Sequence, residues 1–192
     1  MLPKYYEYFN PVKINAGEKA LETIPYELKL LHAKRPVIIT DKGVETAGLL
    51  KIVLDSFADS DLVVGAVYTN TPPDSSVEAV NEIVQIYREN NCDSIIAIGG
   101  GSPMDTAKGV NIVISEGVSD ISKFIGADRV SKPQQPFIAI PTTSGTGSEV
   151  TLVAVISDTV RNVKMPFTSY LLLPKVAVLD PRMTLTLPPK IT

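Results

Sequence analysis

Residues 95–108 read Ile95-Ile96-Ala97-Ile98-Gly99-Gly100-Gly101-Ser102-Pro103-Met104-Asp105-Thr106-Ala107-Lys108. The first four are apolar without interruption, which is typical of a parallel strand covered on both faces. The three glycines that follow allow the backbone to turn sharply and to approach a ligand closely. We therefore expect a buried strand, a glycine turn and a helix in direct succession.

The start of that helix is well specified by its residues. Ser102 is a good N-cap, Pro103 fits the first helical position, and Asp105 stands where a capping-box carboxylate would be. Free N–H groups and the helix dipole, worth roughly 0.3–1 kcal/mol, would favour an anion such as a pyrophosphate here. The stretch predicts a phosphate site; a tight strand-to-helix connection without a ligand is the alternative.

Two familiar nucleotide motifs do not match this segment. A P-loop requires Ser or Thr after its lysine, whereas Lys108 is followed by another glycine. The dinucleotide fingerprint G-x-G-x-x-G matches Gly99 and Gly101 but meets Met104 where its third glycine belongs. The glycine turn also follows two earlier strand candidates, whereas the fingerprint normally follows the first strand of its fold.

A second candidate loop reads Pro141-Thr142-Thr143-Ser144-Gly145-Thr146-Gly147-Ser148-Glu149-Val150-Thr151 and also follows an apolar run. Its hydroxyl groups can form hydrogen bonds with ribose, phosphate or adenine edges. Two such loops at the carboxyl ends of strands imply a crevice for an extended ligand. A hydroxyl-rich surface loop is the alternative reading of this segment.

Short apolar runs alternate with segments of helical period along the chain, which is typical of a parallel sheet flanked by helices. We expect one α/β domain over residues 1–192, Rossmann-like, with a mostly parallel sheet and nucleotide loops at the carboxyl ends of its strands. The first 35 residues are expected to form a separate strand element, at the sheet edge or in a dimer contact. The other expected strands are 37–40, 62–68, the run ending at 98, 137–140, 152–156 and 176–179, with helical spacing over 44–54 and 77–87.

The composition excludes several classes of protein. The 192 residues carry 18 basic and 21 acidic side chains without a basic run, so a nucleic-acid partner is not expected. Cys92 is the single cysteine, which excludes an internal disulfide and suits a reducing compartment. No apolar run approaches the roughly 20 residues of a membrane span, and the N-terminus lacks a signal-like core. We therefore expect a cytoplasmic protein without a membrane partner.

Together these motifs resemble the iron-containing (group III) alcohol dehydrogenases, within the superfamily that also holds glycerol dehydrogenase and dehydroquinate synthase. The Ser-Pro pair after the glycines and the Thr-Thr-Ser-Gly-Thr-Gly-Ser-Glu run are similar to the alcohol dehydrogenase branch. The resemblance covers essentially the whole chain in the expected order. It is carried by residues 99–108 and 141–151, by Thr40-Asp41-Lys42-Gly43, by Asp180-Pro181, and by Thr184-Leu185-Thr186-Leu187-Pro188-Pro189.

The resemblance implies a nicotinamide dinucleotide as the ligand. Asp41 would accept hydrogen bonds from the adenosine ribose and repel a 2′-phosphate, which favours NAD over NADP. The other implied contacts are Asn70 near the adenosine, Gly100, Gly101 and Ser102 around the pyrophosphate, Thr142 and Thr143 on the adenine side, Thr151 and Lys164 toward the nicotinamide, and Leu179 packed on the cofactor.

The residues alone leave plainer readings of these positions open. Asp41 can cap the helix that follows it, and Asn70 can be a turn residue. Lys164 can be a solvated lysine, and Leu179 can belong to a core strand. These alternatives need no ligand.

The family's iron site, by the same resemblance, uses one Asp and three His ligands in a helical second domain after the Leu-Pro-Pro segment. This chain ends at Thr192, and its one histidine, His32, lies far upstream in an ordinary packing or surface context. We therefore expect no metal site and no catalytic residue in these 192 residues. Iron or another divalent metal would act only in the complete enzyme, where it polarises the alcohol oxygen, so the chain alone should be inactive or nearly so.

The sequence is therefore interpreted as the cofactor-binding part of an iron-dependent alcohol dehydrogenase, which transfers hydride between NAD(P) and a primary alcohol or aldehyde when complete. Alternatives are a non-catalytic nucleotide-binding or partner-completing module, and a structural fragment with relic cofactor loops. The face toward the absent helical domain should be apolar, so a homo-oligomer or a partner chain is expected to cover it. With half the cleft open, the dissociation constant for the cofactor should be on the order of 0.1–1 mM.

Overall fold

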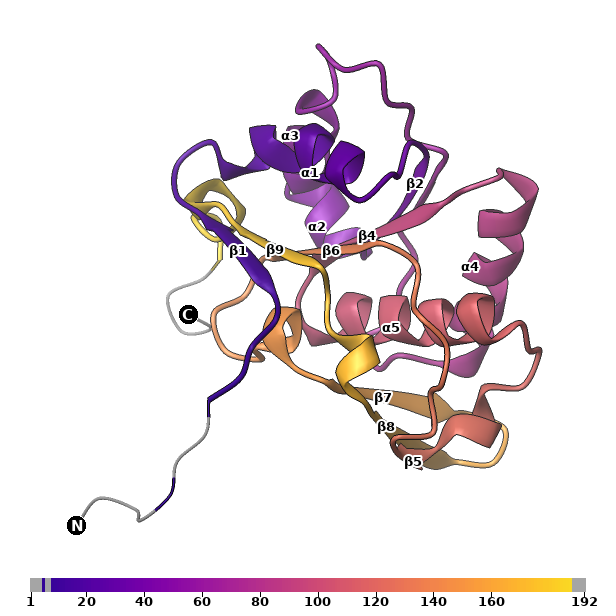
Figure 1. The fold of residues 1–192 in the computed structure, drawn as a ribbon. Helices are drawn as coiled ribbons and strands as arrows, with labels where there is room; N and C mark the ends of the chain where they lie inside the picture. The colour runs from indigo at the N-terminus through magenta and orange to yellow at the C-terminus, as the bar shows by residue number, and fades with distance from the viewer. Residues whose placement is uncertain (1–4, 6–7, 188–192) are drawn as a thin grey trace.

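A six-stranded parallel sheet lies at the centre of the protein, as the computed structural model of Tyr5 and residues 8–187 shows (Figure 1). The expected α/β class, with a parallel sheet flanked by helices, is confirmed. Every strand pair of this sheet is parallel. The strand order is β1 (Lys13–Ala16), β9 (Val176–Leu179), β6 (Phe137–Pro141), β4 (Ser94–Gly99), β2 (Pro36–Ile39) and β3 (Ala66–Tyr68).

The apolar runs of the central strands are buried on both faces because successive side chains point to opposite sides of the sheet. Ile38 and Ile96 belong to one hydrophobic cluster, while Ile39 and Ile95 belong to another. Helices cover both faces of the sheet (Figure 1). One face carries α1 (Ile24–Leu30), α2 (Lys42–Thr46) and α3 (Leu49–Asp55), and the other carries α4 (Val77–Glu89) and α5 (Gly101–Glu116).

A second, three-stranded sheet lies beyond α5 (Figure 1). Its strands are β7 (Val153–Asp158), β8 (Val163–Thr168) and the short β5 (Gly126–Ala127), and β7 pairs antiparallel with β8. The expected strand at 152–156 therefore exists. The alternating pattern predicts it in the main sheet, but it belongs to this second sheet. Gly109 explains how closely α5 packs here, because a Cβ at that position would collide with the side chain of Ile156.

Two expected elements differ in extent from the structure. The helical segment 44–54 is divided into α2 and α3, because the chain turns at Gly48 with a φ of 77° that favours glycine. The expected strand 62–68 pairs only over β3, three residues long. The N-terminal segment forms an edge strand, β1, which pairs only with β9, and continues into a 3₁₀ turn and α1.

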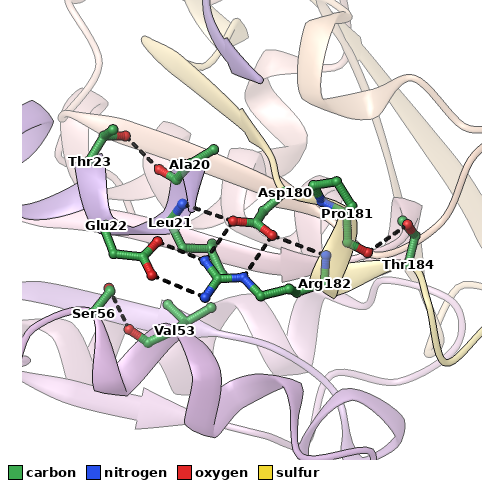
Figure 2. Close-up of polar contacts among 10 residues, drawn as sticks. All are labelled: Ala20, Leu21, Glu22, Thr23, Val53, Ser56, Asp180, Pro181, Arg182 and Thr184. Atoms are coloured by element: carbon green, nitrogen blue, oxygen red, sulfur yellow. Dashed lines mark hydrogen bonds and ion pairs between the residues drawn. The ribbon is translucent and has the colours of Figure 1, made fainter. Parts of the chain in front are cut away.

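Short 3₁₀ turns complete the connections of the chain, and two of them join distant parts of the sequence. Asp180, after β9, accepts hydrogen bonds from the backbone N–H of Leu21 and from the guanidinium of Arg182. Arg182 also forms a two-bond ion pair with Glu22, as Figure 2 shows. The turns are η1 (Ala20–Thr23), η2 (Ile121–Phe124), η3 (Ser148–Val150), η4 (Tyr170–Leu172) and η5 (Pro181–Met183).

Candidate functional site

The strand order creates a crevice between the carboxyl ends of β2 and β4. β3 lies on one side of β2 and β4 on the other, so the chain reverses its direction across the sheet there. The helices that follow β2 and β4 pack in different hydrophobic clusters, on opposite faces. Ligands of open α/β sheets bind at such switch points.

A cleft of about 770 Å³ opens at this place. Its volume is in the range of sites for drug-sized ligands and cofactors. Four connections meet in it: the β2–α2 turn, the loop after β3, the β4–α5 turn, and the hydroxyl-rich loop after β6. The lining residues are Asp41, Lys42, Gly43, Val44, Leu49, Asn70, Thr71, Pro72, Pro73, Gly100, Gly101, Ser102, Pro103, Thr142, Thr143 and Leu187.

The β4–α5 turn is made by glycine backbone alone. Gly99 has a φ of 147°, and a Cβ there would lie 2.6 Å from Cγ of Pro103. Helix α5 then begins at Gly101 with Gly100 as its N-cap and with no side-chain cap. The uncapped first turn leaves backbone donors directed at the cleft, which suits an anionic group.

The expected helix cap is therefore wrong. Ser102 is the second residue of α5, and its hydroxyl donates instead to the carbonyl of Pro73. Pro103 takes the third helical position, where its missing N–H still costs no intrahelical bond. The helix begins earlier than expected because Gly99 completes the turn by itself.

Asp105 does not form the expected capping box. Its two oxygens accept hydrogen bonds from Oγ of Ser148 at 2.9 Å and from the backbone N–H of Val155 at 3.0 Å. The carboxylate thus joins α5 to the hydroxyl-rich loop and to β7.

Asp41 caps helix α2, since its Oδ1 accepts the backbone N–H of Val44 at 2.9 Å. The alternative role of Asp41 as a helix cap is therefore correct, but the cap uses only one of its two carboxylate oxygens. Oδ2 has no hydrogen bond within the described part of the chain, and it lies 3.4 Å from where a Cβ on Gly99 would be. One oxygen is fixed by the cap while the other remains at the cleft beside the glycine turn.

The hydroxyl-rich loop lies directly over the glycines. The N–H of Thr142 donates to the carbonyl of Gly99 at 3.0 Å, and a Cβ on Gly100 would lie 3.3 Å from Oγ1 of Thr143. Thr71 and Thr143 line the cleft, and their hydroxyl oxygens are buried without a hydrogen-bond partner among the described residues. Buried hydroxyls are normally paired. These two fit a ligand that supplies polar atoms, as a nicotinamide dinucleotide does.

Seven of the ten candidate site residues meet in this cleft: Asp41, Asn70, Gly100, Gly101, Ser102, Thr142 and Thr143. The other three lie around it. Lys164 lines a smaller hollow that also contains Gly101 and Ser102, and its ammonium lies 3.3 Å from Asp74. Leu179 lines a depression that shares Thr143 with the main cleft, and Thr151, at the end of the hydroxyl-rich loop, accepts a hydrogen bond from Lys108.

Lys108 is a residue of the site region to which sequence reasoning gave no role. Its side chain is fully buried, and its ammonium donates to the carbonyls of Ser148, Thr151 and Val153 at 2.8–3.0 Å. Burial lowers the pKa of Lys108 to about 8, against the opposing effect of the negative charges of Asp105 and Glu149. A lysine between Ala107 and Gly109, three residues after Asp105, was the available signal.

Thr71 and the two prolines after it were also missed as lining residues, along with Leu49 and Leu187. The sequence showed Thr71-Pro72-Pro73 only as turn chemistry. Their place at the cleft follows from β3 lying beside β2, which the sequence does not specify.

The described residues do not fit an iron ion. No group of three or more His, Cys, Asp or Glu side chains within Tyr5 and residues 8–187 could hold a metal. His32 lines a separate surface hollow with Lys29, Lys34 and Asp61, away from the cleft residues. None of the helices in the described ranges is long and apolar enough to cross a membrane.

The fold and the cleft define an α/β protein of the nucleotide-binding, Rossmann-like type. The family model for iron-containing alcohol dehydrogenase matches residues 11–181, and the chain belongs to this family. It is 37% identical over 185 residues to the NAD-dependent methanol dehydrogenase of Bacillus methanolicus, covering 96% of this chain and 48% of that protein. It is 38% identical over 189 residues to the 4-hydroxybutyrate dehydrogenase of Cupriavidus necator, covering 96% and 48%.

Solved structures agree with this assignment. The crystal structure of a 1,3-propanediol oxidoreductase superposes with a TM-score of 0.92 at 29% identity, covering 98% of this chain and 49% of that one. The sulfoacetaldehyde reductase of Bifidobacterium kashiwanohense, solved in complex with NAD+, gives a TM-score of 0.84 at 32% identity, covering 98% and 50%. The chain spans about half the length of the curated relatives it matches.

Proposed function

We propose that this chain binds NAD as the cofactor-binding part of an iron-containing alcohol dehydrogenase. The observation that carries the proposal is the uncapped start of α5 at Gly101, which opens into a cleft of about 770 Å³. The pyrophosphate would rest on this helix end, with Gly100, Gly101 and Ser102 around it. The sulfoacetaldehyde reductase solved with NAD+ supports the choice of ligand.

Asp41 is proposed to accept hydrogen bonds from the adenosine ribose hydroxyls and thereby to favour NAD over NADP. Its Oδ2 is free to accept ribose hydroxyls while Oδ1 caps α2. A 2′-phosphate at the same place would meet a carboxylate, and the two negative charges repel. Asn70, Thr142, Thr143 and Leu179 are proposed for the adenosine side.

Lys164 and Thr151 are proposed for the nicotinamide end. The hollow beside Lys164 shares Gly101 and Ser102 with the main cleft, so a ligand lying over the helix start could extend into it. That continuity supports an extended dinucleotide rather than a mononucleotide.

The complete enzyme is proposed to transfer hydride between NAD and a primary alcohol or aldehyde. The names of its relatives include methanol, 4-hydroxybutyrate and 1,3-propanediol, which all carry a terminal hydroxyl group. Iron, when bound in the complete enzyme, would polarise the alcohol oxygen. Residues 1–192 would act as a single domain that binds and orients the cofactor.

A second copy of the chain, or a partner chain, is proposed to cover the outer face of the β7–β8 hairpin. Val153 and Val155 are 39% and 36% exposed on the same side of β7, and Val155 also lines the hollow beside Lys164, so a partner on this face would close the nicotinamide end of the site. Neighbouring exposed apolar side chains of this kind favour association.

The decisive experiment is a calorimetric titration of the chain with NAD and, separately, with NADP. We expect a dissociation constant for NAD on the order of 0.1–1 mM and weaker binding of NADP. Asp41→Asn should weaken NAD binding about tenfold while keeping the helix cap, because asparagine also caps helices.

Asp55→Asn, on α3 and away from the cleft, is the matched control and should leave both affinities unchanged. Absence of heat with either nucleotide at millimolar concentration would contradict independent cofactor binding. Equal affinity of wild type and Asp41→Asn for NAD would remove Asp41 from the proposed site.

A further inference from the structure

The hydroxyl-rich loop is held at its two ends in different ways. At its start, the N–H of Thr142 donates to the carbonyl of Gly99, so the loop is joined to the end of β4. At its other end, the ammonium of Lys108 joins it to the middle of α5. Between these attachments, residues 143–147 cross over the glycine turn, and Thr146 lies against Gly101.

The attachment at Lys108 is unusually complete for one side chain. The three carbonyl oxygens at 2.8–3.0 Å match the three N–H donors of an ammonium group. Oγ of Ser148 lies 3.0 Å from the same nitrogen and donates in turn to Asp105, one helical turn earlier on α5. The loop, η3 and the first residue of β7 therefore all converge on two side chains of one helix.

Removal of the ammonium would leave three carbonyl groups without this donor, one in a buried and two in a partly buried hydrogen bond. A buried, unpaired carbonyl costs free energy, and water can satisfy it only if the loop moves away from α5. Such a movement would displace Thr143 and Thr146 from the glycine turn. The geometry of the cleft over Gly100 and Gly101 thus depends on a side chain that does not line it.

We infer that Lys108 is a positioning residue for cofactor binding: its ammonium holds the hydroxyl-rich loop of residues 142–151 over the start of α5 so that the cleft is preformed for a dinucleotide. The inference rests on the proposed function for its ligand, but its structural part can be measured without one. Lys108 acts through Ser148 and Thr151, and none of these three residues is among those that line the main cleft.

Lys108→Met tests this directly, because methionine fills a similar volume and has no donor. Removing one partner of a buried polar cluster destabilises the fold, so we expect a lower thermal unfolding midpoint and make the binding measurement at a temperature where the variant is folded. Under those conditions NAD binding should weaken about tenfold or more, because the loop is no longer held over the start of α5. A merely structural role would lower the midpoint and leave the affinity of the folded variant for NAD unchanged.

Hydrogen exchange of the ligand-free chain gives the second readout. In Lys108→Met, peptides covering Thr142–Val155 should exchange about tenfold faster or more, while those covering β4 and β2 keep their wild-type rates. Thr106→Val is the matched control, because Thr106 is equally buried on α5 and its hydroxyl has no partner among the described residues. It should change neither exchange nor affinity.

Unchanged exchange in Thr142–Val155 of a folded Lys108→Met chain would overturn the inference. If that variant does not fold, Ser148→Ala replaces it. The smaller change removes one link between Lys108 and Asp105, and should still accelerate exchange in the loop; wild-type exchange would again overturn the inference. Absence of NAD binding by the wild-type chain would refute the proposed function alone, because the exchange measurement needs no ligand.

Discussion

Gly99 combines two constraints that are usually separate. Its φ of 147° is one that other residues rarely adopt, and the space where a Cβ would lie is occupied by the ring of Pro103. Both constraints serve the same end, since they turn the chain from β4 directly into the uncapped helix α5.

Substitution of Gly99 by alanine should lower the free energy of unfolding by about 2–3 kcal/mol, through backbone strain and the collision with Pro103. Gly17→Ala is the matched control. Gly17 also has a positive φ, 130°, but nothing lies within 4 Å of a Cβ there. Its cost should be about 1 kcal/mol, from strain alone. Urea denaturation measures both, and equal costs for the two variants would show that the contact with Pro103 is unimportant.

Lys108 should make stability depend on pH in an unusual direction. Its pKa in the folded protein is about 8, below the ordinary value of 10.5, so the unfolded chain binds more protons between these values. Stability therefore rises as pH increases through this window, by about 2 kcal/mol between about pH 8 and pH 10.

The measurement is the difference in unfolding free energy between wild type and Lys108→Met across that pH range. Burial also raises the pKa of Cys92, which has the opposite effect, but this contribution cancels because both proteins contain the cysteine. A difference that stays constant with pH would show that Lys108 retains an ordinary pKa.

At the residue scale, the sequence predicted positions better than conformations. Asp41 was expected at the end of a strand and stands there, because its place follows from the apolar run before it. Ser102 was expected as a helix cap on the strength of its residue type. The glycines before it allowed the helix to start earlier, and such backbone freedom leaves no signal in a cap pattern.

At the scale of elements, β4 and α5 were predictable because the signal lies within one continuous stretch. The strand is apolar throughout and the turn is made of glycines, so neighbouring residues determine both. The β7–β8 hairpin was harder to predict. Residues 152–156 look like another sheet strand, and only the tight packing of α5 on Ile156 through Gly109 explains why they join a different sheet. Pairing of this kind depends on contacts between distant segments.

The turns η1 and η5 are joined by the ion pair between Glu22 and Arg182, beside Asp180. The Asp180 side chain is fully buried, and the Arg182 guanidinium beside it holds the pKa of that carboxyl below its ordinary value of 3.8. The resulting stability is present above that pH, and it is lost as pH falls through the lowered pKa of the folded protein.

Arg182→Met should cost about 3 kcal/mol of unfolding free energy at neutral pH, because it leaves Asp180 buried and without its cationic partner. Glu22→Gln is the control on the other side of the same guanidinium. Glu22 is about half exposed, so its loss should cost less than about 1 kcal/mol. Thermal unfolding of both variants checks this order, and a larger effect at Glu22 would contradict it.

At the scale of the whole molecule, the exposed apolar face of β7 predicts self-association. Light scattering should give a mass above that of one chain, 20.7 kDa, at high protein concentration. Val153→Lys should shift the mass toward a single chain, because a charge would have to be desolvated in the contact. Val160→Lys, in the exposed turn between β7 and β8, is the control and should not. A strictly monomeric wild type would contradict the proposed association.

The arrangement of β1 also has a consequence for the order in which the protein is made. This strand leaves the ribosome long before its partner β9, and Leu21 is 159 positions from the Asp180 that it contacts. Contacts between such distant segments form late and slowly. Leu21, Ile24 and Leu28 are fully buried in the finished fold. During synthesis they lack their contacts with β9 until that strand has been made. The segment of β1, η1 and α1 is therefore one that a chaperone would protect until β9 has been made.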